Sequence, residues 1–332
     1  MQRLTIAIPT YDRNDVLLRS LEPLLPQLTR DCTLLIVDNK SPRPVRDTVE
    51  PLLARHPHVD WKIVRNVANL GLVGNILRCF ELCRTEWLWV LSDDDTVRPD
   101  AIRIINEEID KQSDAVVFHF SSQLYARDKT IVTRGTADFV ERLDEFWHTL
   151  FVSTSVYHAP AVVPYLRLGL NHANSLASHF VLVLAALKEN GVCCLSERQI
   201  VDWNEPAKNQ EWSRIVLGLG VMTVLDMDMP SAVRRPLARK MLDSIPHIRV
   251  FVLQLLLLSV RTGDTESSLY LYDQMCSRLY YYERRPAHRM ARWVYRMMLR
   301  FPRLSYRTLN AYKTARGTSL KTQISPDAGS RT

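Results

Sequence analysis

The chain has 332 residues, of which 46% are hydrophobic, and a formal net charge of +7. This size and apolar content suffice to bury a sizeable core, so they exclude a disordered chain and favour about two domains, or one domain with an extension. The charge describes only the C-terminal segment, because residues 284–332 carry twelve Lys or Arg and one acid, whereas residues 1–283 sum to −4.

The cysteines and the apolar runs indicate a cytoplasmic protein. The six cysteines include no C-x-x-C pair and no regular spacing, so we expect reduced thiols. The first residues do not have the apolar run and small-residue cleavage site of a signal peptide. The longest apolar run, at 250–260, is well below the ~20 residues of a membrane span. We therefore expect no membrane-spanning helix.

Short apolar runs alternate with segments of helical periodicity through the first 120 residues. Strands are expected at 4–8, 33–37, 61–64, 87–91 and 115–118, with helices between them. This alternation is typical of βαβ units. It predicts an α/β domain of the Rossmann type, with a mostly parallel sheet and helices on both faces.

Three polar clusters follow strands directly, at 10–13, 38–41 and 93–95. Ligands of such sheets bind beyond the carboxyl ends of the strands, so we expect the three clusters to face one crevice. The last cluster places the carboxylates of Asp93, Asp94 and Asp95 side by side. A fold tolerates such like charges where they are solvated or neutralised by a cation. An acidic turn that caps the next helix is the alternative interpretation.

The residue types in these clusters suit a nucleotide diphosphate held by a metal. Carboxylates bind the hard cations Mg²⁺ and Mn²⁺, which commonly share their oxygen ligands with phosphates. Asp38 can accept a hydrogen bond from a base or a ribose hydroxyl, and the amides of Asn69 and Asn75 can bind sugar or phosphate. Gly71 allows close backbone approach. Neither a G-x-G-x-x-G segment nor a P-loop follows the first strand, which argues against a dinucleotide-binding or P-loop protein.

Four segments, in order over roughly residues 3–120, resemble motifs of the family-2 glycosyltransferases with the GT-A fold. They are Ile8-Pro9-Thr10-Tyr11-Asp12-Arg13, Ile36-Val37-Asp38-Asn39-Lys40-Ser41, Asn69-x-Gly71-x-x-x-Asn75 and Leu91-Ser92-Asp93-Asp94-Asp95-x-x-x-Pro99. The resemblance implies a nucleotide-sugar donor, with a nucleoside site and further donor contacts at Pro9, Thr10, Tyr11, Arg13, Asp38, Asn69, Gly71 and Asn75. It also implies that metal and diphosphate bind at the acidic triplet. Asp94 is the closest match to the metal-ligating aspartate, with Asp93 and Asp95 beside it.

Beyond residue 120 the chain departs from the family pattern. A strand is expected at 151–157, and the resemblance implies that Ser153 faces the sugar; an ordinary half-buried strand is the alternative. Many inverting relatives place Glu-Asp at the start of the next helix, the Asp being the base. Here Ser178 and His179 stand in that place. A resemblance to a subgroup with His there makes His179 the candidate base, because histidine titrates near neutral pH. A local hydrogen bond at a helix start is the alternative.

A polar loop at 202–212 follows two expected strands, at 192–195 and 199–201. Such a loop can close over a donor, with Trp203 stacked on the sugar and Asp202 taking part in proton transfer. A surface loop anchored by its tryptophan is the alternative interpretation.

From residue 212 onward the periodicity is helical, and the last helix is basic and amphipathic. One face of it carries arginines and the other carries apolar residues: Arg285, Arg289, Arg292, Arg296 and Arg300 against Met290, Trp293, Val294, Met297 and Phe301. The pattern at 285–301 favours an anionic membrane surface as a partner. A packed helix with a solvated arginine face, or an oligomer contact, is the alternative. We expect no nucleic-acid partner, because an acidic crevice would repel a phosphate backbone.

We therefore predict a GT-A-like domain at 1–212, with a nucleotide-binding part at about 1–120 and an acceptor part at 121–212. A helical extension at 213–316 and a loose tail at 317–332 follow. The expected reaction is metal-dependent transfer of a hexosyl or deoxyhexosyl group, with inversion, to a hydroxyl of a glycan or lipid-linked oligosaccharide. The resemblance is to enzymes of bacterial surface polysaccharides such as the lipopolysaccharide O-antigen, so we expect a peripheral location at the inner face of the cell membrane.

Two other functions stay open. A non-catalytic protein that binds nucleotide sugars or glycans would explain the missing acidic base at 178–179. A sugar nucleotidylyltransferase would share the sheet and Mg²⁺, but it should carry a Gly-rich basic loop after the first strand, where Pro9–Arg13 stands instead.

Overall fold

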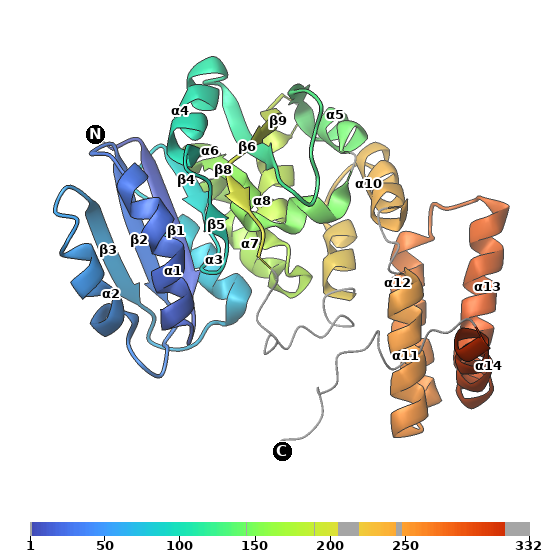
Figure 1. Ribbon diagram of the computed structural model, residues 1–332. Helices are drawn as coiled ribbons and strands as arrows, with labels where there is room; N and C mark the ends of the chain where they lie inside the picture. The colour runs from blue at the N-terminus through green and yellow to red at the C-terminus, as the bar shows by residue number, and fades with distance from the viewer. Residues whose placement is uncertain (1, 144, 189, 205–218, 244–247, 316–332) are drawn as a thin grey trace. The chain divides into compact units, whose positions relative to one another are not determined.

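The computed structural model describes residues 2–143, 145–188, 190–204, 219–243 and 248–315 (Figure 1). The chain divides into two units, Met1–Ala207 and Lys208–Thr332, and each is described by itself. Most of the polar loop expected at 202–212 and the tail expected at 317–332 lie outside the described residues.

The N-terminal unit is built on an eight-stranded sheet with the order β3-β2-β1-β4-β8-β6-β9-β7. The strands are β1 (Leu4–Thr10), β2 (Cys32–Asp38), β3 (Asp60–Arg65), β4 (Trp87–Val90), β6 (Ala115–Ser121), β7 (Ile131–Arg134), β8 (Ser155–His158) and β9 (Val192–Gln199). β8 runs antiparallel to β4 and β6, and β7 runs antiparallel to β9, while the other pairs are parallel. A two-stranded sheet pairs β5 (Thr96–Val97) with β10 (Val201–Asp202).

Helices cover both faces of the large sheet (Figure 1). They are α1 (Asn14–Leu24), α2 (Val45–Leu53), α3 (Gly71–Leu82), α4 (Ala101–Lys111), α5 (Gly135–Arg142), α6 (Ala159–Val162), α7 (Leu166–Asn171) and α8 (Ser178–Leu187). Apolar residues of α1, α2 and α4 form one core with β1, β2 and β4, whereas α3, α7 and α8 pack together on the other face. Because both faces are covered, the central strands read as continuous apolar runs.

The register of the parallel strands aligns their carboxyl ends. Thr10 at the end of β1 pairs with Asp38 at the end of β2, and Asp38 pairs with Arg65 at the end of β3. Beyond β4, the amide of Leu91 donates to the carbonyl of Ala7, which brings the acidic turn to the same edge. The mostly parallel α/β sheet predicted from the sequence is therefore confirmed.

One expected strand is wrong in its extent. Residues 151–154 were expected to extend β8, but they form a 3₁₀ turn at Val152–Thr154, and the strand begins at Ser155. The reason lies in the neighbouring strand. Trp89 Nε1 donates to the Ser153 carbonyl at 2.7 Å, and the Ser92 amide donates to Ser153 Oγ at 2.9 Å, so these bonds hold the turn against β4.

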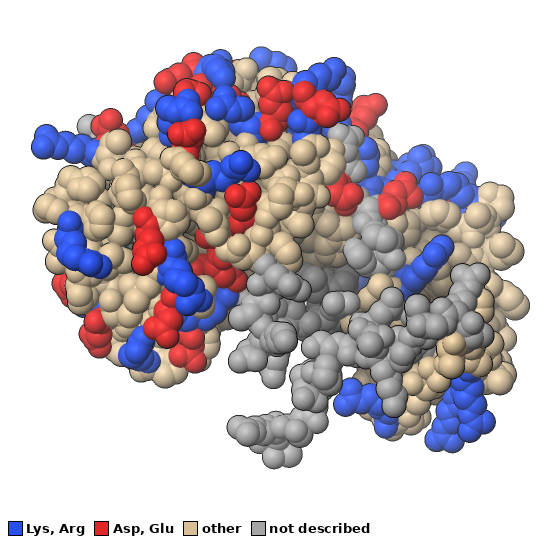
Figure 2. All heavy atoms as spheres, viewed as in Figure 1, with Lys and Arg blue, Asp and Glu red and all other residues tan. Residues whose placement is uncertain are grey.

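The C-terminal unit is helical, as expected. Its helices are α10 (Ser231–Asp243), α11 (Ile248–Thr262), α12 (Thr265–Leu279), α13 (Pro286–Arg300) and α14 (Pro302–Ala315). In the view of Figure 2 this unit displays basic side chains but no acidic ones at the end where α14 lies. Among the described residues no single helix is long and apolar enough to cross a membrane, and α10 with α11 meets that criterion only as a pair bent by 70°.

Two tryptophans of β4 provide a matched test of how the 3₁₀ turn is held. Both rings are fully buried, but Trp87 Nε1 has no hydrogen-bond partner among the described residues, whereas Trp89 Nε1 binds the buried Ser153 carbonyl. Trp89→Phe leaves that carbonyl unpaired, so it should lower the free energy of unfolding by about 1–3 kcal/mol more than Trp87→Phe does. Urea denaturation measures both losses, and equal losses would contradict this account of the turn.

Candidate active site

The carboxyl ends of β1 and β4 meet at the acidic turn 92–95. Asp93 is fully buried, and its Oδ2 accepts a hydrogen bond from Thr10 Oγ1 at 2.5 Å. Asp93 Oδ1 lies 2.9 Å from Arg13 Nη2 but receives no hydrogen bond from the described residues. Burial raises the pKa of the Asp93 carboxyl to about 6, although the Arg13 charge and the Thr10 hydroxyl act to lower it. This carboxylate is therefore short of compensating positive charge.

Asp95 has the same character on the other side of the turn. Its side chain is 2% exposed and accepts a hydrogen bond from Ser153 Oγ at 2.6 Å. Burial raises the pKa of the Asp95 carboxyl to about 7, and the Ser153 hydroxyl acts to lower it. Since Ser153 Oγ also accepts from the Ser92 amide, its hydroxyl is used inside the turn. Ser153 is therefore buried with its hydroxyl bound to Asp95, and its expected contact with the sugar stays a prediction.

Asp94 is the most exposed carboxylate of the turn, and with Asp95 it lines a cavity of about 290 Å³. Its Oδ2 accepts from Arg13 Nη1 at 2.6 Å and its Oδ1 from Ser92 Oγ at 2.5 Å. The cavity is lined by Arg13, Val16, Arg19, Ser20, Asp94, Asp95, Thr96 and Asn204. The turn does not cap the next helix, because α4 begins after Asp100 and no side chain caps it. The alternative interpretation of the triplet is therefore not observed.

Asp38 lies at the same edge, and the protein already uses its carboxylate. It is 1% exposed and accepts hydrogen bonds from Arg65 Nη1 at 2.5 Å, from the Ser41 amide at 2.8 Å and from the Val45 amide at 3.4 Å. A nucleoside contact through Asp38 would compete with these bonds. Arg65 and Ser41 are thus part of the site, and no motif in the sequence singled them out for this contact.

Four asparagines join the loop before α3 to the ends of β1 and β2. Asn75 is 3% exposed, and its Nδ2 donates to the carbonyls of Val37 and Thr10 at 3.0 and 3.4 Å. Its Oδ1 accepts from Asn66, and the Asn69 side chain accepts from Asn39 Nδ2 at 2.7 Å. The Asn75 amide is therefore used within the protein, whereas exposed Asn69 uses its Oδ1 there and donates no hydrogen bond from Nδ2 to the described residues. Buried Asn39 and Asn66 were not foreseen, because their partners are distant in sequence.

The remaining expected donor contacts differ in accessibility. Pro9 and Thr10 are buried at the end of β1, while Tyr11 is 43% exposed beyond it. Gly71 begins α3 with a φ of +70°, a conformation that favours glycine. Asp202 pairs with Arg98 at 3.2 Å across the small sheet.

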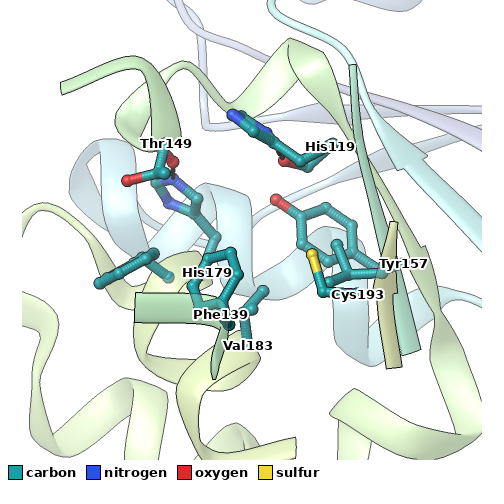
Figure 3. A pocket seen from close by; sticks show the side chains of 10 residues that line it. His119, Phe139, Thr149, Tyr157, His179, Val183 and Cys193 are labelled. Carbon is teal, nitrogen blue, oxygen red and sulfur yellow. Dashed lines mark hydrogen bonds between the residues drawn. The ribbon is translucent and has the colours of Figure 1, made fainter. Parts of the chain in front are cut away.

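His179 is not at the crevice, so its expected role as catalytic base is wrong for this structure. Its side chain is 3% exposed and lines a small cavity of about 10 Å³, which also contacts His119, Tyr157 and Cys193 (Figure 3). His179 Nε2 donates to the Thr149 carbonyl at 3.1 Å. Burial lowers the pKa of His179 to about 4. A general base must lie within reach of the hydroxyl that it deprotonates. The cavity has room for roughly one water molecule, which is too little for a sugar acceptor beside His179.

Two buried histidines, His119 and His148, form a hydrogen-bonded pair beside this cavity. His119 Nε2 lies 2.9 Å from His148 Nδ1, His119 Nδ1 lies 3.0 Å from Ser155 Oγ, and His148 Nε2 lies 2.8 Å from Ser122 Oγ. Burial holds the pKa of His119 well below its ordinary value and lowers that of His148 to about 3. Both rings are therefore neutral near pH 7. The sequence offers no signal for this pair, because the two residues are 29 positions apart.

Comparison with known proteins gives three results. Residues 5–156 match the family described as Glycosyl transferase family 2. Chondroitin synthase of Escherichia coli is 24% identical over 132 residues, which are 40% of this chain and 19% of that protein, so the chain spans about a fifth of the relative. Two solved structures share the fold at low identity. They are S. aureus TarS 1-349 in complex with UDP-GlcNAc (TM-score 0.63, 13% identity, 96% of this chain and 93% of that one) and the mannosyltransferase PcManGT of Pyrobaculum calidifontis with GDP-Man and Mn²⁺ (TM-score 0.52, 10% identity, 91% and 87%).

The burial of His179 leads to a test of stability against pH. The unfolded chain takes up a proton on this residue near pH 6.5, whereas the folded chain does so only at about 4. Stability is therefore present above pH 6.5 and is lost as the pH falls toward 4. His179→Gln removes this linkage, so the free energy of unfolding should fall by about 2 kcal/mol less than in the wild type between neutral pH and pH 5. Parallel profiles from chemical denaturation would contradict the assignment.

Proposed function

We propose that this chain, whose N-terminal unit belongs to glycosyl transferase family 2 and has the GT-A fold, transfers a sugar from a nucleotide-sugar donor to an acceptor hydroxyl. The family and the fold predicted from the four sequence motifs are confirmed by these comparisons. The observation that carries the proposal is the acidic turn itself. Two buried carboxylates with raised pKa and one accessible carboxylate meet the ends of β1 and β2 beside a cavity of about 290 Å³.

The proposal includes a divalent cation, Mg²⁺ or Mn²⁺. The three carboxylates of the turn are hard oxygen donors of the kind that these ions prefer. The uncompensated burial of Asp93 and Asp95 also fits a further positive charge at this place. Among the described residues, no three acidic, His or Cys side chains are arranged to hold an ion by themselves, so donor oxygens would complete its ligand shell. When bound, such an ion stabilises the departing diphosphate as a Lewis acid.

Arg13 has a particular place in this proposal. Its guanidinium lies 2.9 Å from Asp93 Oδ1 and 2.6 Å from Asp94 Oδ2, where it compensates both carboxylates. We propose that Asp94, with Asp93 and Asp95 beside it, binds the cation in place of Arg13. Arg13 would then be free to contact the diphosphate, since arginine pairs well with phosphate oxygens. Thr10 and Ser153 would act as positioning residues, because each holds one buried carboxylate through a hydroxyl hydrogen bond.

The nucleoside is proposed to lie against exposed Tyr11, near Pro9, Asp38 and Gly71. Asn69 and Asn75 would support this site indirectly, because their hydrogen bonds hold the loop before α3 in place. The catalytic base is not assigned to His179, because that side chain is buried.

For the acceptor we propose a glycan or lipid-linked hydroxyl, as in the assembly of bacterial surface polysaccharides such as the O-antigen. The transferred group is proposed to be a hexosyl or deoxyhexosyl unit, with inversion. The similarity to chondroitin synthase supports transfer to a glycan by analogy. The basic helix at 285–301 supports a cytoplasmic protein that is peripheral to the membrane, where a lipid-linked acceptor would lie.

A non-catalytic protein that binds nucleotide sugars is the second candidate. One observation favours it: Ser178 and His179 occupy the place where a base is common among inverting relatives, and both side chains are buried. Donor binding without transfer would be its signature.

Assays of transfer from a panel of nucleotide sugars, with Mn²⁺ or with a chelator, test the proposal. Wild-type activity should need the cation, and Asp94→Asn should lower turnover by about 100-fold or more, because the carboxylate charge that holds the cation is lost. Asp128→Asn is the matched control, because Asp128 is exposed and lies far from the turn in the sequence. Undiminished transfer by Asp94→Asn would contradict the metal role. Donor binding by a wild type that transfers nothing would favour the second candidate.

A further inference from the structure

Helix α13 carries an exposed apolar stripe, which continues onto α14. We call it the α13 stripe and define it as Met290, Trp293, Val294, Phe301 and Leu304. The Trp293 and Met290 side chains are 64% and 66% exposed, although such large apolar side chains are usually buried. Residues 290, 293, 294 and 301 recur at helical spacing, so they form one continuous face.

The opposite face of α13 is the one that packs inside the C-terminal unit. Leu299 is fully buried there, and the α13 backbone accepts a hydrogen bond at the Arg292 carbonyl from Tyr272 of α12. Arg296 pairs with Asp273 of α12 at 3.0 Å. The α13 stripe is therefore not the face through which α13 packs into the core of this unit. It points away from the helices that hold α13 in place.

Basic side chains accompany the stripe, and their charge is not compensated locally. Residues 284–315 contain no Asp or Glu. Some arginines of the segment pair with acids of α10 and α12, as Arg296 does. Within the part of this unit that the structure describes, six have no acidic partner: Arg284, Arg289, Arg292, Arg300, Arg303 and Arg307. The end of the unit at α14 shows basic and no acidic side chains in Figure 2.

From this combination we infer that the α13 stripe inserts into the surface of an anionic phospholipid bilayer. Trp293, Met290 and Phe301 lie at the boundary between headgroups and acyl chains, where amphipathic helices bury their apolar face. Arg289 and Arg300 contact the anionic headgroups beside it. The inference deepens the proposed peripheral location, but it does not need glycosyl transfer, because bilayer binding is measured without donor or acceptor.

Other occupants fit the charge less well. Two copies of the stripe in a two-fold symmetric contact would bring the same uncompensated arginines together, and like charges oppose such an interface. A nucleic acid would satisfy the arginines but not the aliphatic side chains of Met290, Val294 and Leu304, which offer no ring for a base to stack on. A bilayer satisfies the apolar stripe and the arginines together.

Flotation of the full chain with lipid vesicles tests the inference. We expect binding to vesicles that contain phosphatidylglycerol, weak or no binding to pure phosphatidylcholine, and loss of binding at high salt. Met290→Ser/Trp293→Ser should lower the partition coefficient about tenfold or more, because the inserted apolar area is removed. Arg289→Gln/Arg300→Gln should also lower the partition coefficient by more than tenfold, because each arginine contributes a factor of about five.

Two matched controls identify the face. Tyr270→Ser removes an equally exposed apolar side chain from α12, and Arg43→Gln/Arg46→Gln removes two exposed arginines from the N-terminal unit. Both should bind vesicles like the wild type. The inference is overturned if the wild type does not bind anionic vesicles, or if both stripe variants bind as well as the controls. It is also overturned if Trp293→Ser converts a dimer to a monomer, or if Trp293 proves to be shielded from a soluble quencher without vesicles. Circular dichroism verifies that each variant is folded.

Discussion

The burial of two carboxylates at the ends of parallel strands is the constraint on which the site depends. Asp93 and Asp95 are almost fully removed from water, and a buried charge must be paired or neutralised. The fold supplies one hydroxyl to each, from Thr10 and from Ser153, and a single guanidinium, that of Arg13. Their raised pKa values show that this compensation is incomplete. A ligand that brings positive charge to the turn would complete it, which is why we propose a cation-binding site there.

The parts of this site that could be predicted from the sequence are those that strand ends determine. Thr10, Asp38 and Asp93 each follow an apolar run directly, and the edge of a parallel sheet necessarily brings such residues together. Their partners could not be predicted in this way. Ser153 binds Asp95, which is 58 residues away in the sequence. It lies in a 3₁₀ segment for which the sequence pattern wrongly predicts a strand. Asn75 was expected to bind a ligand, but its amide donates to two backbone carbonyls, those of Val37 and Thr10, which lie far from it in the sequence.

His179 and the α13 stripe both show that local sequence does not determine which side of a helix is buried. A histidine at a helix start suggests a base, but helix periodicity says nothing about whether the start faces a crevice or a core. His179 faces a core, and burial keeps it neutral. The apolar face of an amphipathic helix suggests packing, but in α13 the buried side is marked by Leu299 alone, and the large apolar residues are outside. In both cases tertiary contacts decide what local sequence leaves open. The two proposed sites thus lie in separate units, an acidic turn for a metal and donor in the first and a basic apolar surface for a membrane in the second.

We propose that Arg13 and a divalent cation compete for the carboxylates of the acidic turn, and titration of the donor-free chain with Mn²⁺ measures this competition. The electron paramagnetic resonance signal of free Mn²⁺ gives the affinity. Arg13→Gln removes the competing charge, so it should tighten Mn²⁺ binding by about tenfold, whereas Asp94→Asn should weaken it by a similar factor. Arg46→Gln, on the exposed surface of α2, should change nothing. An Arg13→Gln affinity equal to or weaker than that of the wild type would contradict the account.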